Sequence, residues 1–248
     1  MSLPFSELHS LVRKFGINSN SFLTLYEGYH YFLSKNTMGP GALPYVETSH
    51  AWVGAAEPLA GPEDTEVLLK EFTEAAEAAG KIAMFLPVGK PFKEFACQRG
   101  YGAFKVGSEP IFALASYPVS LDHVSTAKRL YARGARISEF FPKQIGTDKL
   151  LELEQMVAEW ITTRKTGQLG FLNRVEPWTL REEKKYFWTI LDGKIIAFLA
   201  AVPTPLKKSW YLVDIFRYGN SPPGATELLV GEILPESKYQ KMKTIYFT

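Results

Sequence analysis

The chain has 248 residues, 46% of them hydrophobic and 14% aromatic, which is enough apolar material for one large core or two small ones and excludes a disordered chain. Its 28 Lys and Arg residues are nearly balanced by 26 Asp and Glu residues, so a strongly basic surface is excluded, although a local basic patch is not. The single cysteine, Cys97, excludes an intrachain disulfide and favours a reducing cytoplasm.

Helical and strand-like patterns alternate in the first half of the chain. Apolar residues with a helical spacing predict a helix over residues 6–15, ended by Gly16. Alternating, partly aromatic stretches then predict short strands of an antiparallel meander over residues 21–26, 29–34, 43–47 and 51–55. A longer helix over residues 64–79 begins at Asp64, which suits an N-cap, and a buried strand follows over residues 81–88.

The second half contains a similar mixture of elements. Helices are predicted over residues 124–136 and 148–165. The dipeptide Asp192-Gly193 supplies the positive φ angles of a type I′ turn, so the flanking residues 186–191 and 194–202 are predicted to form a β-hairpin. The remaining elements are a strand over residues 210–216, a loop over 219–224, a helix over 225–234 and a strand over 243–247.

The two halves share one order of elements, namely strand, Gly/Pro-rich loop, helix and strand. This order predicts an internal repeat and an α+β protein of two tandem domains, residues 1–118 and 119–248, each a mixed, mostly antiparallel sheet flanked by helices. A chance match between two short α/β segments is the alternative. The order in the second half is that of the GNAT-like acyltransferase fold, in which the loop before the last helix holds a phosphate with backbone amides.

That loop departs from the usual phosphate-binding pattern. Residues 219–224 lack the Arg/Gln-x-x-Gly-x-Gly/Ala sequence, and Pro222 and Pro223 remove two amide donors. Standard binding of coenzyme A is therefore disfavoured, and an acyl-CoA-dependent N-acyltransferase remains only an alternative.

Several short motifs carry a resemblance to a known family. They are Lys105-Val106-Gly107-Ser108-Glu109-Pro110, the basic helix over residues 128–134, Trp160 with Gly170-Phe171, the hairpin over residues 192–198, and Val213-Asp214-Ile215-Phe216-Arg217 with Pro223-Gly224. From about residue 22 to its end, the chain resembles the C-terminal catalytic region of the lysyl-phosphatidylglycerol (aminoacyl-phosphatidylglycerol) synthases. The resemblance implies tandem acyltransferase-like domains that move an aminoacyl group from aminoacyl-tRNA to a hydroxyl acceptor, either a lipid or a small molecule.

The resemblance also implies two catalytic residues at the end of one strand. Asp214 and Arg217 match the family's Asp-x-x-Arg motif, so Asp214 would act as a base or anchor the α-ammonium group of the donor, and Arg217 would hold a phosphate or the oxyanion. A salt bridge between the two, fixing the end of the strand, is the structural alternative.

Five further positions are substrate-binding candidates. Arg129 and Arg133 share a helix face with Arg136 and suit phosphate contacts, although an ordinary solvated face has the same pattern. The family motifs add Lys105, Glu109 and Gly224, and the first two equally suit an ordinary hairpin turn.

No metal or other cofactor is expected, because the four histidines are scattered and form no ligand pattern. No apolar run approaches the roughly 20 residues of a transmembrane helix, so we expect a cytoplasmic protein, peripheral to the membrane if its acceptor is a lipid. Typical family members carry a membrane-embedded N-terminal portion and a basic-aromatic C-terminal helix that this sequence lacks. A non-catalytic ligand-binding module of the same fold is therefore a second functional alternative.

Overall fold

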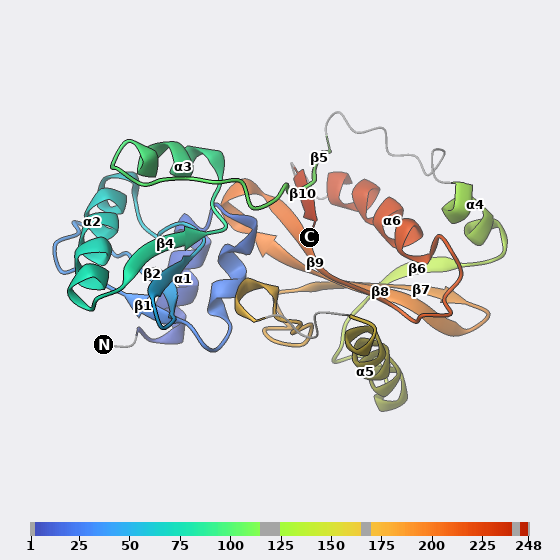
Figure 1. Ribbon diagram of the computed structural model, residues 1–248. Helices are drawn as coiled ribbons and strands as arrows, with labels where there is room; N and C mark the ends of the chain where they lie inside the picture. The colour runs from blue at the N-terminus through green and yellow to red at the C-terminus, as the bar shows by residue number, and fades with distance from the viewer. Residues whose placement is uncertain (1–2, 115–124, 165–169, 240–243, 248) are drawn as a thin grey trace. The chain divides into compact units, whose positions relative to one another are not determined.

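The computed structural model describes residues 3–114, 125–164, 170–239 and 244–247, which form two compact units (Figure 1). Unit 1 comprises Met1–Ser108 and Thr204–Lys207, and unit 2 comprises Glu109–Pro203 and Lys208–Thr248. The predicted domain boundary between residues 118 and 119 lies outside the described residues and stays a prediction.

Unit 1 is built on a four-stranded sheet in the order β1-β2-β3-β4. The first three strands are antiparallel, and β3 and β4 are parallel because helix α2 connects them. Its elements are α1 (Phe5–Phe15), the 3-10 helix η1 (Ser19–Leu25), β1 (His30–Phe32), β2 (Leu43–Glu47), β3 (Ala51–Ala55), α2 (Pro62–Ala78), β4 (Ile82–Leu86), α3 (Lys90–Cys97) and η4 (Pro205–Lys207).

The core of unit 1 centres on Phe72 of α2, which is completely buried. Its ring lies 5.4 Å from that of Tyr45 and 5.6 Å from those of Phe32, Trp52 and Phe85, measured between centroids. Four strands thus contribute aromatic side chains to one helix residue, which fixes α2 against the sheet.

Residues 21–26 were predicted as a strand, but residues 21–25 belong to η1 and Tyr26 is its C-cap, so that prediction is wrong. Local hydrogen bonds explain the difference. The side chain of Asn18 accepts from the amide of Asn20 at 2.9 Å, and the Ser21 hydroxyl accepts from the amide of Asn18 at 3.2 Å. The Thr24 hydroxyl then donates to the Ser21 carbonyl at 2.7 Å. Such side-chain contacts offer the backbone an alternative to strand pairing.

Unit 2 contains a six-stranded sheet in the order β5-β10-β9-β8-β7-β6. Strand β10 is parallel to β9 and antiparallel to β5, and the β6, β7 and β8 neighbours are antiparallel. Its elements are β5 (Ile111–Ala113), α4 (Ser125–Ala132), β6 (Arg136–Phe140), α5 (Thr147–Thr162), the 3-10 helix η3 (Phe171–Asn173), β7 (Lys185–Leu191), β8 (Lys194–Thr204), β9 (Ser209–Arg217), α6 (Ala225–Tyr239) and β10 (Thr244–Phe247).

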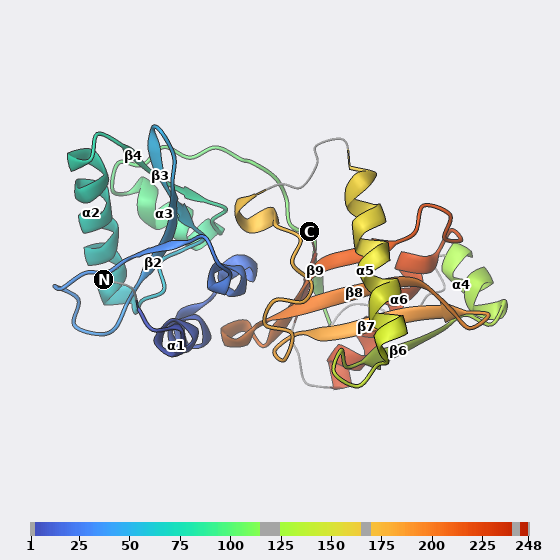
Figure 2. The same cartoon turned by 90° about the horizontal axis from the view of Figure 1, so that it is seen from below.

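Helices cover both faces of this sheet. Helices α4 and α6 lie on one face, where Ala127, Leu130 and Leu229 pack in a core with Leu199 and Leu212 of the strands. Helix α5 crosses the other face (Figure 2), where its residues pack in a second core. That core includes Leu153 and Met156 of α5 together with Tyr186, Phe198 and Phe216 of the strands.

The hairpin prediction is confirmed, since Asp192 and Gly193 have φ angles of 50° and 76° between β7 and β8. The helix predicted over residues 124–136 is partly wrong. Helix α4 ends at Ala132, Gly134 follows with a φ of 101°, and Arg136 begins strand β6. Arg136 therefore does not share a helix face with the other arginines.

The predicted repeat is visible in the topology of both units. In unit 1 the sequence β3-α2-β4 forms a parallel pair in which Trp52 lies opposite Ala83. In unit 2 the sequence β9-α6-β10 forms a parallel pair in which Trp210 lies opposite Ile245. Each unit is a mixed sheet flanked by helices, as predicted.

Gly224, at the start of α6, occupies a position that no other residue fits well. Its φ is 99°, and a Cβ atom there would lie 2.6 Å from the carbonyl carbon of Thr126 in α4. We therefore expect Gly224→Ala to lower the free energy of unfolding by about 2 kcal/mol or more, from backbone strain and steric overlap. Urea unfolding measures the loss.

Gly219 in the same loop is the matched control. A Cβ atom there meets only the Glu159 Oε1 atom, at 3.6 Å, which is an ordinary contact. Gly219→Ala is expected to change stability by no more than about 0.5 kcal/mol. Equal losses in the two variants would contradict the close approach of α4 to α6.

Candidate active site

Two buried side chains of opposite charge, which we call the buried pair, interact electrostatically in unit 2. Asp214 of β9 and Lys184, directly before β7, are each only 7% exposed. Burial raises the pKa of the Asp214 carboxyl to about 6 and lowers the pKa of the Lys184 ammonium group to about 8. Attraction between the two groups opposes both shifts, so each side chain keeps the other closer to its charged form.

The alternation of the strands brings these side chains to the α5 face of the sheet. Lys184 is in phase with Tyr186 and Trp188, which both pack in the core under α5. Strand β9 changes its alternation, because Leu212 packs under α6 whereas Phe216 packs under α5. Asp214 lies between these two residues, next to the charge of Lys184.

A loop segment, residues 174–179, contacts Lys184, and we call it the strap. The Lys184 ammonium group donates to the main-chain carbonyls of Glu176 at 2.6 Å and Pro177 at 3.2 Å. The Tyr186 hydroxyl donates to the same Pro177 carbonyl at 2.6 Å. The indole of Trp178 stacks on the ring of Tyr186 with centroids 5.6 Å apart. The strap is thus held by polar and aromatic contacts.

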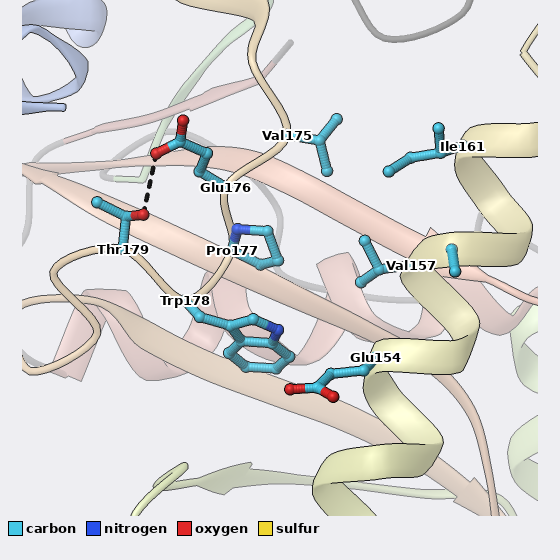
Figure 3. Close-up of a pocket in the computed structure, with 9 residues that line it drawn as sticks. Glu154, Val157, Ile161, Val175, Glu176, Pro177, Trp178 and Thr179 are labelled. Carbon is cyan, nitrogen blue, oxygen red and sulfur yellow. Dashed lines mark hydrogen bonds between the residues drawn. The ribbon is translucent and has the colours of Figure 1, made fainter. Parts of the chain in front are cut away.

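The carboxylate of Glu176 also stays within the strap. It forms an ion pair with Arg174 and accepts a hydrogen bond from the Thr179 hydroxyl at 2.9 Å (Figure 3). Its charge raises the pKa of Lys184 by attraction, so it adds to the effect of Asp214 on that group.

A pocket of about 320 Å³ lies between the strap and α5 (Figure 3). Val157 and Ile161 of α5 face Val175 across it. The carboxylate of Glu154 lies beside the indole of Trp178 at one end. This lining suits an aliphatic or aromatic group, with a carboxylate for a cation. Because Pro177 both lines the pocket and accepts from Lys184, the pocket and the buried pair share a wall.

Arg217 does not join Asp214. Its side chain is exposed at the end of β9, and its guanidinium donates to the Tyr218 carbonyl at 3.5 Å. Residues three apart on a strand face opposite sides of the sheet. Among the described residues no ion pair links Asp214 and Arg217, so the salt bridge considered as a structural alternative is not formed.

Arg129 and Arg133 also lie away from Asp214. Both are exposed, at the last turn of α4 and just beyond it. Since α4 packs on the α6 face of the sheet through Ala127 and Leu130, the arginines lie on the side of the sheet opposite to Asp214. The predicted binding residues of unit 2 thus form two separate groups.

Lys105 and Glu109 are exposed in a segment without regular secondary structure, and the division between the units falls between Ser108 and Glu109. Lys105 therefore belongs to unit 1 and Glu109 to unit 2, and their binding role stays a prediction. Gly224 is buried at the start of α6, where it allows the close approach of α4.

Two backbone amides of the loop before α6 already donate hydrogen bonds within the protein. The amide of Gly219 donates to the Glu159 carboxylate at 2.9 Å, and the amide of Ser221 donates to the Tyr218 carbonyl at 3.1 Å. Since Pro222 and Pro223 have no amide hydrogen, few donors are left for a phosphate group.

The comparisons with known proteins identify the family. A family model described as phosphatidylglycerol lysyltransferase, C-terminal, matches residues 9–247. The chain belongs to this family. A relative of the same description, the phosphatidylglycerol lysyltransferase of Bacillus subtilis (strain 168), is 23% identical over 228 residues, which are 90% of this chain and 26% of the relative. The chain therefore spans about a quarter of that curated relative.

Two solved structures have the same fold as this member of the phosphatidylglycerol lysyltransferase C-terminal family. One is the C-terminal domain assigned to a lysylphosphatidylglycerol synthetase of Agrobacterium fabrum, with a TM-score of 0.83, 21% identity, and coverage of 98% of this chain and 77% of that one. The other is the L-PGS of Bacillus licheniformis, with a TM-score of 0.84, 20% identity, and coverage of 97% and 74%. These likenesses show the fold of the chain, and each of its two units is a mixed sheet flanked by helices, as predicted.

Three residues of the site in this family member, Lys184, Tyr186 and Glu176, were not predicted from the sequence. One signal was present: Lys184 is in phase with the buried residues of β7, where a lysine is unusual. Its position beside Asp214, 30 positions along the chain, depends on the sheet order.

Metal-binding groups of three or more His, Cys, Asp or Glu side chains are absent from the described part of this phosphatidylglycerol lysyltransferase family member. In the same residues no helix is both long and apolar enough to cross a bilayer.

Proposed function

We propose that this chain is an aminoacyltransferase that moves an aminoacyl group from aminoacyl-tRNA to a hydroxyl group of a lipid or small-molecule acceptor. The observation that carries this proposal is the buried Asp214–Lys184 pair beneath the strap, next to a pocket, in a member of the phosphatidylglycerol lysyltransferase family. Sites in which burial and a charged partner shift pKa values are candidates for proton transfer and for binding ions.

The reaction exchanges one ester for another. The acceptor oxygen forms a bond to the aminoacyl carbonyl carbon, and the bond from that carbon to the tRNA ribose oxygen breaks. The proton of the acceptor hydroxyl passes to the leaving ribose oxygen. Asp214 would accept that proton in transit or hold the α-ammonium group of the donor, and its buried carboxylate suits either role.

The exposed cations would serve the phosphate groups of the substrates. Arg129 and Arg133 present two charges on one side of unit 2, where they would contact the tRNA backbone or a lipid headgroup. Arg217 would hold a phosphate or the oxyanion at the end of β9. Lys105, Glu109 and Gly224 are proposed substrate-binding residues on their family motifs alone.

Family membership and the loop before α6 favour this proposal over the two alternatives. The family description, a lysyltransferase, favours an enzyme over a non-catalytic binding module. An acyl-CoA-dependent enzyme would need the amide donors that Pro222 and Pro223 lack. The Bacillus subtilis relative is named for transfer to phosphatidylglycerol. We therefore propose a lipid acceptor reached from the membrane periphery.

Asp214→Asn is expected to lower the rate of transfer about 100-fold, since an amide neither accepts the proton nor carries the charge. The measurement follows labelled lysine from charged tRNA to vesicles containing phosphatidylglycerol, or to glycerol. Asp192→Asn is the matched control, because asparagine tolerates the positive φ of that turn position. Absence of transfer from any charged tRNA by the wild-type chain would contradict the proposal, as would full activity of Asp214→Asn.

A further inference from the structure

We propose that Lys184 is a positioning residue of the site, whose ammonium group fixes the strap and keeps the Asp214 carboxyl ionised beside the pocket. The activity readout of this inference depends on the proposed function, whereas its titration readout does not.

The geometry of the Lys184 ammonium group supports a positioning role. Its two bonds to the carbonyls of Glu176 and Pro177 lie in a site where the lysine is 7% exposed. Backbone carbonyls in such a place need a donor, because an unpaired buried acceptor costs its full desolvation energy. The hydroxyl of Tyr186 supplies one further donor to Pro177. Lys184 therefore determines where the strap, and with it one wall of the pocket, lies.

The charges around Asp214 also support a positioning role for Lys184. The groups that face the pair are the carboxylate of Glu176 from the strap, already paired with Arg174, and the phenol of Tyr186 from β7. Arg181 and Glu182 act more weakly on Tyr186. Of these charges, Lys184 is the one that lowers the pKa of Asp214, while burial and Glu176 raise it. Without Lys184 the carboxyl would hold its proton at neutral pH.

Lys184 has two separable properties, a hydrogen-bond donor and a positive charge. A hydrogen-bond donor alone would hold the strap, and a positive charge alone would ionise Asp214. Lys184→Gln removes the charge and retains an N–H donor, and Lys184→Arg retains the charge. Tyr186→Phe removes one bond to the strap and leaves the charges unchanged. These three variants separate the two properties.

The titration experiment follows the ¹³C resonance of the Asp214 carboxyl by NMR. In Lys184→Gln the midpoint is expected to rise by about one unit or more, the usual effect of losing an opposite charge nearby. In Lys184→Arg and Tyr186→Phe it is expected to stay near the wild-type value. An unchanged midpoint in Lys184→Gln would overturn the inference, and so would an equal shift in Tyr186→Phe.

The wild-type protein provides a measurement that needs no variant to fold. The Lys184 ¹³Cε resonance is expected to titrate below the ordinary range for lysine and to report the ionisation of Asp214 as a second step, since coupled groups titrate as a pair. An ordinary lysine titration with no second step would overturn the inference.

The activity readout is the pH profile of kcat/KM. In the wild-type chain the acid limb reports ionisation of Asp214 and the alkaline limb loss of the Lys184 proton. Lys184→Gln is expected to move the acid limb upward, whereas Lys184→Arg is expected to keep it and to abolish the alkaline limb, because arginine does not lose its proton. An acid limb at the same pH in wild type and Lys184→Gln would overturn the inference.

The two proposals fail in different ways. If the wild-type chain transfers no aminoacyl group but the titrations behave as expected, the proposed function fails and the positioning role stands. If the wild type is active but the titration midpoint of Asp214 is unchanged in Lys184→Gln, the positioning role alone fails.

Discussion

Lys184→Met is expected to lower the free energy of unfolding by about 3–5 kcal/mol at pH 7, because it leaves the Asp214 carboxyl buried without its counter-ion. Asp214→Leu is expected to lower the free energy of unfolding by a similar amount, since the Lys184 ammonium group then lacks the opposite charge of Asp214. The double variant is expected to lose much less than the sum, because apolar groups replace both charges. Urea unfolding of the four proteins measures this cycle.

Lys185→Met is the matched control for the cycle. Lys185 lies next to Lys184 in the chain and forms an ion pair with Glu139 at 3.5 Å. The side chains of Lys185 and Glu139 are 21% and 26% exposed. Lys185→Met is expected to lower the free energy of unfolding by at most about 1 kcal/mol. Additive losses in the Lys184 and Asp214 variants would contradict the electrostatic coupling of the pair.

The pH dependence of the cycle has a definite sign. The folded pKa of Asp214, about 6, lies above its ordinary value of 3.8, so the native state binds the proton more tightly than the unfolded state. Relative to Asp214→Leu, the wild type is therefore expected to lose stability as the pH rises from about 4 to 6. The folded pKa of Lys184, about 8, lies below 10.5, so wild-type stability relative to Lys184→Met is expected to rise again between these values.

The sequence predicted those elements of the fold whose signal is local. The dipeptide Asp192-Gly193 defines its hairpin by backbone conformation alone, and both long helices have strong apolar periodicity. Strand β6 was missed because the predicted helix was continued to Arg136 across Gly134, whose φ of 101° lies beyond the end of helix α4. Strand β5 has three residues in the middle of the chain and pairs with β10, near the C-terminal end. Such pairings have no local signal.

The candidate site was predicted only in part, for a topological reason. Asp214 was found through a motif in its own strand. Lys184 directly precedes β7, which is separated from β9 by β8 in the sheet order. Arg129 and Arg133 are exposed, which suits both the predicted phosphate contacts and the alternative of a solvated helix face. Periodicity assigns a helix its buried side, however, and does not say which face of the sheet the helix covers. Because α4 covers the α6 face of the sheet, the arginines and Asp214 lie on opposite faces.

Phe72→Ala is expected to lower the free energy of unfolding of unit 1 by about 3–5 kcal/mol, because it leaves a cavity among rings that close packing holds together. Phe72 is completely buried, and its ring contacts those of Tyr45, Trp52 and Phe85 at centroid distances of 5.4–5.6 Å. Those residues come from three strands of one sheet, which cannot close on the cavity without changing their register. Urea unfolding combined with hydrogen exchange measures the loss.

Phe104→Ala removes the same ring from a side chain that is 78% exposed, so its effect is expected to stay within about 0.5 kcal/mol. In Phe72→Ala the loss of exchange protection is expected in the amides of β2, β3 and β4, whose side chains surround the missing ring. A small loss in Phe72→Ala, or one equal to that of Phe104→Ala, would show that α2 is not fixed by this aromatic core. Because α2 connects the parallel strands β3 and β4, the repeat relating unit 1 to unit 2 depends on that packing.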